Sequence, residues 1–369
     1  MAVRMKDIAK ELGLSVVTIS KVLRNHPDIA EETRERVLRR VKELDYQPNI
    51  TARSLVTGRS YLIALIVPDL LHPFFAEVAK ALSEAVGKSG YSVIISSSEE
   101  SAELEQREIQ QLTARSLDGL VIASCDTELQ SFQRLDRREL PYVLIDRELA
   151  GHVANFVGIN DEAAGRTATD HLIAQGCRRV AHIGGRENST ATRRLEGYKT
   201  ALQYHRMPFD PSLVVARSNV DIDSVRTGAE AMSILLREKK MPDGVFAYND
   251  PLAIGAMGAI LEAGLQIPED IAIIGCGNLH YDESLRVPLS SVDQKTRQIG
   301  ERTAAILLGI LDSKIRPQPR SVILEPSLVV RASSLRIRAD RQGAPISPSR
   351  KTGQPAQLRR NSKRTSRAR

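Results

Sequence analysis

Short apolar runs alternate with amphipathic helical patterns from residue 61 to about residue 331, and this alternation restricts the fold more than any other feature of the chain. Alternating strands and helices need crossover connections, which make the strands parallel and cover both faces of the sheet. The pattern restarts near residue 160, which predicts two α/β lobes, with later crossovers near residues 292 and 320. Ligands of such folds bind at the carboxyl ends of the strands, so a cleft between the lobes is expected. Strands are predicted at 61–67, 91–96, 119–123, 142–145, 156–159, 180–183, 245–247 and 271–275, and helices at 74–88, 104–114, 162–175, 195–205, 225–237 and 251–263.

Residues 5–25 have the pattern of a helix, a tight turn and a second helix. Ile8 and Leu12 recur one helical turn apart, Gly13 can adopt the left-handed conformation of the turn, and Ser15 can cap the second helix. This is the outline of a DNA-binding helix-turn-helix, with a small packing motif as the alternative. The second helix would bury Ile19, Val22 and Leu23 and turn Val16, Val17, Ser20 and Lys21 towards base edges and phosphates.

A third helix is predicted at 29–44, followed by a shorter one at about 48–57. Pro48 ends the preceding helix, and Ala52 and Leu55 share one face of the short segment. A helix of one or two turns does not hold its structure alone in water, so it needs a partner helix or DNA. We therefore expect a DNA-binding domain with its hinge helix at 1–60, a two-lobed domain at 61–335 and a tail at 336–369.

Charge is unevenly distributed along the chain. Residues 1–60 hold 12 Lys and Arg against 8 Asp and Glu, and residues 336–369 hold 11 against 1. Because the net charge of the whole chain is +7, residues 61–335 must carry a net charge of −7. A basic head on an acidic body is typical of a DNA-binding module joined to a regulatory domain, since only the head must approach phosphates. The basic tail lacks apolar periodicity and is predicted to be disordered, either as a solvated extension or as an additional attraction for DNA.

Several classes of protein are disfavoured by what the sequence lacks. No apolar run approaches 18 residues and the start lacks a signal-peptide core, so we expect a cytoplasmic protein without a membrane partner. The chain contains no Gly-x-x-x-x-Gly-Lys phosphate loop, no Gly-x-Ser-x-Gly and no His-Glu-x-x-His, which disfavours an enzyme. We therefore expect no catalytic residue, no metal site and no cofactor. The cysteines (Cys125, Cys177, Cys276) are expected to be buried, and four histidines (His171, His182, His205, His280) to be capping or surface residues.

Thirteen short motifs occur in register along residues 4–335. They lie at 6–9, 13–15, 18–20, 31–34, 46–49, 52–55, 72–75, 145–147, 171–173, 182–185, 194–198, 249–250 and 267–270. Together they resemble the LacI/GalR family of bacterial transcription regulators. The resemblance implies a helix-turn-helix head, a hinge helix and a periplasmic-binding-protein-like body. It also implies a homodimeric repressor that binds a pseudo-palindromic DNA operator under the control of a small-molecule effector, a sugar or sugar derivative.

The same resemblance implies which residues contact DNA. The two positions that choose bases are Val16 and Val17, whose methyl groups can contact thymine but cannot form hydrogen bonds. Lys21 reads guanine or contacts phosphate, and Leu55 wedges into the minor groove beside its dimer mate. The full implied set is Lys6, Ser15, Val16, Val17, Thr18, Ser20, Lys21, Asn25, Asn49, Ala52 and Leu55.

For the effector cleft, the resemblance implies Phe74, Asp146, Arg194, Asn249 and Asp250. These side chains combine an aromatic face with carboxylate, amide and guanidinium groups, which suits a ligand rich in hydroxyl groups. Each has a structural alternative: Phe74 in the core, Asp146 and Asp250 as caps, and Asn249 as the stabiliser of a turn.

The chain departs from the family pattern at the cleft. Gly277 stands where sugar-responsive members carry an aspartate, and His72 replaces the usual asparagine before Pro-Phe-Phe. Loss of that carboxylate leaves room for a more acidic ligand. A ligand-binding carrier without DNA function, of the periplasmic type, is the alternative to a regulator, and the basic head disfavours it.

Overall fold

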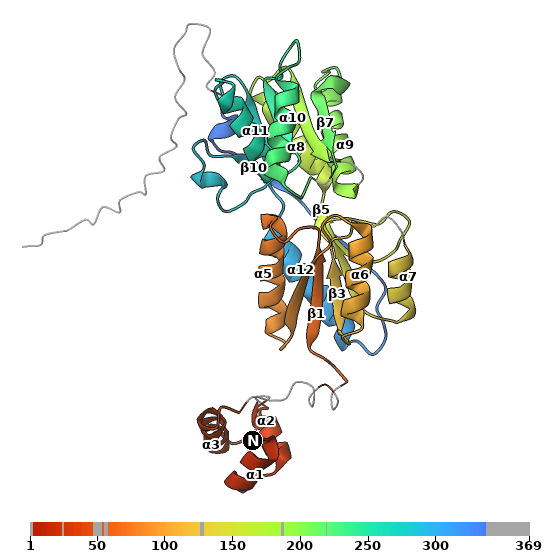
Figure 1. The fold of residues 1–369 in the computed structure, drawn as a ribbon, viewed down its shortest axis with the longest axis vertical. Helices are drawn as coiled ribbons and strands as arrows, with labels where there is room; N and C mark the ends of the chain where they lie inside the picture. The colour runs from red at the N-terminus through yellow and green to blue at the C-terminus, as the bar shows by residue number, and fades with distance from the viewer. Residues whose placement is uncertain are drawn as a thin grey trace, which may run out of the picture.

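The computed structural model describes residues 3–23, 26–46, 54, 58–125, 129–185, 188–218 and 220–336, and Figure 1 shows their arrangement. Most of the predicted hinge helix and the tail from residue 337 onward lie outside these residues. The described parts form a three-helix head and a two-lobed α/β body, which confirms the predicted fold class.

The head is built from three helices around a small apolar centre. They are α1 (Met5–Leu12), α2 (Val16–Leu23) and α3 (Glu31–Glu43). Ile8, Ile19 and Val37 contribute one fully buried side chain from each helix. Gly13 ends α1 with φ 65°, a left-handed conformation that glycine adopts without steric cost, and so allows the sharp turn into α2.

The first lobe contains a six-stranded parallel sheet in the order β11-β5-β4-β3-β1-β2. Helices α5 and α12 pack on one face, and α6 and α7 on the other. The strands are β1 (Leu62–Val67), β2 (Ser92–Ser97), β3 (Gly119–Ile122), β4 (Tyr142–Ile145), β5 (Asn155–Ile159) and β11 (Ser321–Leu324); the helices are α5 (Pro73–Gly87), α6 (Ala102–Thr113), α7 (Gln130–Arg137) and α12 (Thr296–Asp312).

The second lobe repeats this architecture in the order β12-β10-β9-β8-β6-β7, with β12 antiparallel to β10. Helices α8 and α9 cover one face and α10 and α11 the other. The strands are β6 (Val180–Gly185), β7 (Val214–Arg217), β8 (Gly244–Ala247), β9 (Ala272–Gly277), β10 (Ser290–Asp293) and β12 (Ser327–Val329); the helices are α8 (Asp161–Ala174), α9 (Ser189–Tyr204), α10 (Ser224–Leu235) and α11 (Asp250–Glu262). Short 3₁₀ turns lie at Pro211–Leu213, Asp282–Ser284 and Ala332–Ser334.

The chain passes between the lobes after β5, between β10 and α12, and between β11 and β12. Four strands and two helices were absent from the sequence prediction: β7, β10, β11, β12, α7 and α12. Two further expectations were wrong. Cys125 is only partly buried, and His182 is a core residue whose ring stacks on Phe246 and whose Nδ1 lies 3.0 Å from the Phe246 carbonyl oxygen.

Among the described residues, no helix has the length and apolar character needed to cross a membrane. The same residues contain no group of three or more His, Cys, Asp or Glu side chains placed to hold a metal ion.

Candidate nucleic-acid interface and effector cleft

The outer face of α2 carries the residues expected to read DNA. Val16 and Val17 are 46% and 63% exposed, so their methyl groups are accessible to a partner. The Ser15 Oγ accepts a hydrogen bond from the Thr18 backbone N–H at 3.0 Å and lies 2.8 Å from the Thr18 hydroxyl, so it caps α2 as predicted. Lys6 is exposed and Ser20 is half-buried. Asn25, Asn49, Ala52 and Leu55 lie outside the described residues.

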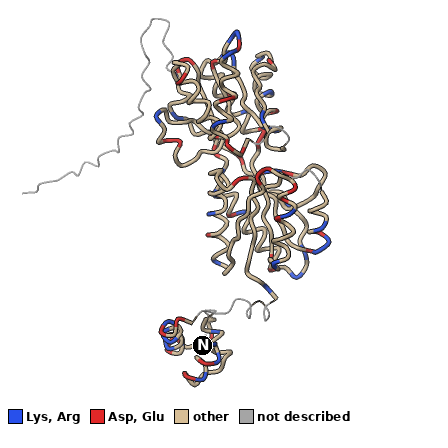
Figure 2. Tube along the Cα trace, viewed as in Figure 1, with Lys and Arg blue, Asp and Glu red and all other residues tan. Residues whose placement is uncertain are grey.

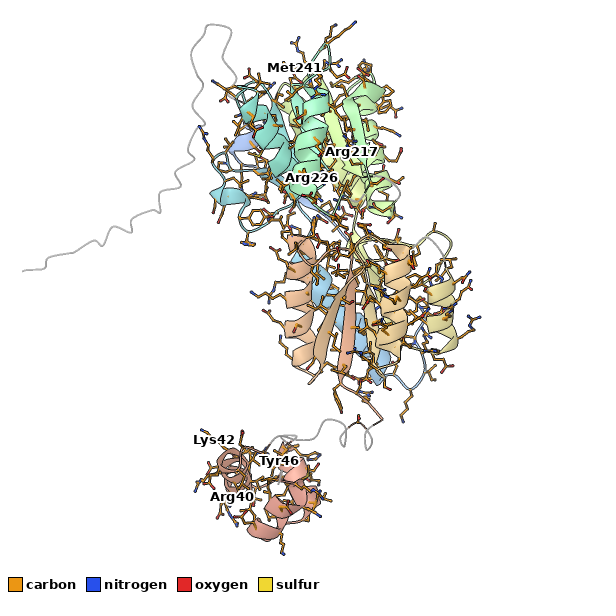
Figure 3. The ribbon with its side chains drawn as sticks, viewed as in Figure 1. Arg40, Lys42, Tyr46, Arg217, Arg226 and Met241 are labelled. Atoms are coloured by element: carbon orange, nitrogen blue, oxygen red, sulfur yellow. The ribbon has the colours of Figure 1, made fainter. Side chains whose placement is uncertain are left out.

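Lys21 has a protein partner that the sequence did not reveal. Its Nζ donates a hydrogen bond to Asp28 Oδ2 at 2.5 Å, and this hydrogen bond lowers the pKa of the Asp28 carboxyl. Both side chains are substantially exposed, so a phosphate or a base could compete with Asp28 for the lysine. Elsewhere in the head, Arg40, which Figure 3 labels on α3, pairs with Glu11 of α1 and with Glu43. The pair with Glu11 ties α3 to α1.

Asp146 lies at the carboxyl end of β4, where the first lobe meets the second. Its backbone has φ 62°, a left-handed conformation that is uncommon for a residue other than glycine and is often found at functional sites. The residue is 8% exposed, and its carboxyl makes no hydrogen bond within the described part of the chain; its nearest ion-pair partner is Arg147 Nε, 3.8 Å from Oδ2. Burial raises the pKa of this carboxyl to about 7.

Arg194, on α9, is buried and holds three parts of the second lobe together. Its Nε donates to Asp161 Oδ1 at 2.8 Å, Nη1 to the Tyr248 carbonyl at 2.6 Å and Nη2 to Gln294 Oε1 at 3.1 Å. The guanidinium carbon also lies 4.6 Å from the centre of the Tyr248 ring. These contacts fix the guanidinium in one orientation.

Asn249 stabilises the start of a helix and also contacts a side chain of the first lobe. Its Oδ1 accepts a hydrogen bond from the Leu252 backbone N–H at 2.8 Å, which caps α11. Its Nδ2 donates to Asp221 Oδ1 at 3.1 Å and lies 3.1 Å from His72 Nε2, across the boundary between the lobes. The asparagine therefore caps a helix and contacts His72 of the first lobe at the same time.

An ion pair that was not predicted joins the lobes beside these groups. Arg147, directly after Asp146, donates from Nη2 to Asp221 Oδ2 at 2.5 Å and to Glu100 Oε1 at 2.5 Å. Burial alone would raise the pKa of Asp221, but the charge and hydrogen bond of Arg147, together with the charges of His72 and Arg194, outweigh it, and the pKa lies below its ordinary value. Arg147 could have been suspected from its position beside Asp146. Asp221 could not, because it follows β7, a strand that was not predicted.

Within the described residues, Phe74 and Asp250 make no hydrogen bond or ion pair with these polar side chains. Phe74 is 3% exposed and packs edge-to-face on Phe75, with ring centres 5.1 Å apart. Asp250 accepts hydrogen bonds from the Ser291 hydroxyl at 2.6 Å and from the Leu279 N–H at 3.3 Å. A Cβ atom on Gly277 would stand 2.4 Å from Asp250 Oδ2, so the Asp250 carboxylate occupies the space beside the glycine.

Comparison with known proteins assigns both parts of the chain. Residues 4–49 match the family described as bacterial regulatory proteins, lacI family, and residues 169–334 match a periplasmic binding protein-like domain. The ribose operon repressor of Halalkalibacterium halodurans is 32% identical over 311 residues, which cover 84% of this chain and 91% of that protein.

Two solved structures are similar over nearly the whole chain. A complex of the transcriptional regulator CelR with cellobiose is 28% identical, with a TM-score of 0.68 over 90% of this chain and 99% of that one. The lac repressor dimer bound to operator and the anti-inducer ONPF is 25% identical, with a TM-score of 0.77 over 91% of this chain and 100% of that one. The chain thus belongs to the LacI family of bacterial regulatory proteins, and it is a DNA-binding transcription regulator, as predicted, and not an enzyme.

Proposed function

We propose that this regulator is a homodimeric repressor that binds a pseudo-palindromic operator and responds to a sugar or sugar derivative held between its lobes. The observation that carries the proposal is the coexistence, in one chain, of an exposed α2 reading face and a buried set of polar side chains supplied by both lobes. The relatives support it by what their names say of them: a ribose operon repressor, a regulator in complex with cellobiose and a repressor dimer on its operator. A regulator of chromosomal DNA acts in the cytoplasm.

Operator choice rests on α2. Val16 and Val17 offer methyl groups to thymine, which gives direct readout by shape and apolar contact and not by hydrogen bonds. Lys21 would exchange Asp28 for a guanine or a phosphate when the helix enters the major groove. Leu55 would enter the minor groove at the centre of the operator with its dimer mate, and unstacking that base step costs a few kcal/mol.

Coupling between effector and DNA requires that the effector bind one arrangement of the lobes better than another. The contacts that cross the cleft, Arg147 with Asp221 and His72 with Asn249, are the ones a ligand in this position must rearrange. A change in the angle between the lobes would move the two first lobes of the dimer. The hinge helices at about 48–57 would then separate and lose the apolar face that each offers the other.

The proposal is tested by sequence-selective DNA capture with the full-length protein. Genomic fragments retained at physiological salt should share a pseudo-palindrome, and a panel of sugars, sugar acids and purine derivatives should contain a ligand that changes their retention. Retention without sequence preference would contradict the regulator. Ligand binding with no effect on DNA would favour the carrier-type alternative. A reporter placed under the captured operator separates repression from activation.

A further inference from the structure

Acidic side chains outnumber basic ones at the junction of the lobes, and Figure 2 shows Asp and Glu positions gathered there. Within the described part of the chain, the carboxyl groups there are supplied by Glu100, Asp146, Asp161 and Asp221. The guanidinium groups are supplied by Arg147 and Arg194. All six side chains are nearly buried, with between 2% and 11% of their surface exposed, so solvent screens their charges weakly.

Both guanidinium groups are already engaged by acceptors of the protein. Arg194 is held by Asp161, by the Tyr248 carbonyl and by Gln294. Arg147 donates to both oxygens of Glu100, at 3.1 and 2.5 Å, and to Asp221. Arg147 Nε is buried without a hydrogen-bond partner, 3.8 Å from Asp146 Oδ2. Because this is a single N–H, neither arginine presents a free two-pronged donor to an incoming carboxylate or phosphate, the geometry by which arginine recognises such anions.

Of these four carboxyl groups, Asp146 is the one that accepts no hydrogen bond from either arginine. It has no hydrogen-bond partner among the described residues although it is nine-tenths buried, and its left-handed backbone holds it at the end of β4. His72 Nδ1, which belongs to the same lobe as Asp146, is also buried and has no hydrogen-bond partner. Buried polar groups without partners are rare in folded proteins, and in a cleft they indicate where a ligand binds. Burial also raises the pKa of Asp146, and the nearby charges of Arg147 and Arg194 offset this effect only in part.

We propose that the effector of this regulator is a cationic polyol, an amine-bearing sugar, whose ammonium group is received by Asp146 with Asp221 as the second carboxylate. The inference rests on the proposed function, because it assumes an effector in this cleft. An ammonium group supplies both the hydrogen-bond donors that Asp146 lacks and the positive charge that the junction lacks. The hydroxyl groups of the sugar can pair with His72 and Asn249.

The same arrangement opposes sugar acids and sugar phosphates, although the glycine at position 277 by itself suggested a more acidic ligand. The space beside Gly277 is filled by Asp250, whose carboxylate would lie 2.4 Å from a Cβ there. Replacement of the family's aspartate by glycine therefore does not make this part of the cleft less acidic.

The test compares sugars that differ only in the charge of one substituent. Isothermal titration calorimetry on the full-length protein at pH 7 would use 6-amino-6-deoxy-D-glucose, D-glucose and D-glucuronate, the corresponding galactose series, and the 2-amino sugars. We expect the amine to bind at least ten times more tightly than the neutral sugar in the series that fits, and the acid to bind more weakly than both. In the Asp146→Asn variant, the amine should bind less than three times more tightly than the neutral sugar. The control is Glu301→Gln, which removes an exposed carboxylate on α12 and should leave the preference for the amine unchanged.

Equal or tighter binding of the neutral sugar or the acid by the wild-type protein would overturn the inference, and so would an amine preference that survives in Asp146→Asn. If that variant does not fold, the order of affinities in the wild-type protein decides alone. A panel in which no sugar binds would reject the sugar effector together with this inference. Operator capture by the same preparation would then show that DNA binding stands independently.

Discussion

The ion pair between Arg147 and Asp221 should be the strongest single contact across the lobes. In Asp221→Ala, Arg147 keeps Glu100 but loses the 2.5 Å hydrogen bond from its Nη2, and Asn249 loses the acceptor 3.1 Å from its Nδ2. Removal of one member of a buried pair costs about 3–5 kcal/mol, and we place this case at about 3 kcal/mol because Glu100 still neutralises the arginine. For domains of this size each kcal/mol lowers Tm by about 2–4 °C, so a fall of about 6–12 °C is expected.

Glu148→Ala is the matched control, because Glu148 also crosses the lobe boundary, where it pairs with Arg193. That pair is exposed, with 28% and 48% of the side chains accessible, so its loss should cost at most about 1 kcal/mol. Differential scanning calorimetry of the full-length variants at pH 7.5 measures both. A fall in Tm of less than 3 °C for Asp221→Ala, or one no larger than that of the control, would refute the reasoning. It would show that the cost of burying the two charges cancels their attraction.

The effect should also depend on pH in a defined direction. Since the folded-state pKa of Asp221 is depressed, its contribution is fully present above the pKa of an unfolded aspartate, about 3.9, and is lost as the pH falls through the lower folded-state value. The difference in Tm between wild type and Asp221→Ala should therefore be constant from pH 8 to about pH 5 and shrink only below about pH 4. A difference that vanishes near pH 6 would point to another titrating group.

Three further outcomes are expected. Leu55→Ala should weaken binding to the operator while leaving binding to random DNA nearly unchanged in fluorescence anisotropy; equal losses on both would argue against the minor-groove wedge. Asp28→Asn should tighten DNA binding by up to about fivefold, because it releases Lys21 from an exposed ion pair, and an unchanged or weaker affinity would contradict this. Gly255→Ala should lower Tm sharply, since its Cβ would stand 1.8 Å from a backbone oxygen of α10. Gly258→Ala, with open space at the same helix, should not lower it, and equal Tm values would count against the close packing.

The sequence predicted best where a pattern is local. The strand at 142–145 is a continuous apolar run and appears with the same bounds in the structure, because a strand buried on both faces needs apolar residues throughout. Strands β10 and β12 escaped prediction because Ser290–Asp293 and Ser327–Val329 are short and rich in serine, and only their neighbours in the sheet make them strands. Helix α12 did carry a helical apolar pattern, including Ile299, Ile306 and Ile310, that could have been used.

In the candidate site, too, some residues could be predicted from the sequence and others could not. Asp146, Arg194 and Asn249 could be named from the sequence because they belong to motifs that resemble those of a known family, and the structure brings them to the junction of the lobes. Asp250 belongs to such a motif too, and in the structure its carboxyl accepts hydrogen bonds from Ser291 and Leu279. No motif marks Asp221 as a partner of Arg147.

By itself, the sequence determined the order of the parts, the helix-turn-helix with its exposed valines, the α/β class of the body and the family, because each of these depends on residues close together in the chain. Only the tertiary structure decided the charge balance of the cleft. Glu100, Arg147 and Asp221 are separated by up to 121 positions, and they meet because two independently built sheets direct the ends of their strands at one another. Electrostatic energy depends on distance in space and on burial, and neither can be read from spacing along the chain.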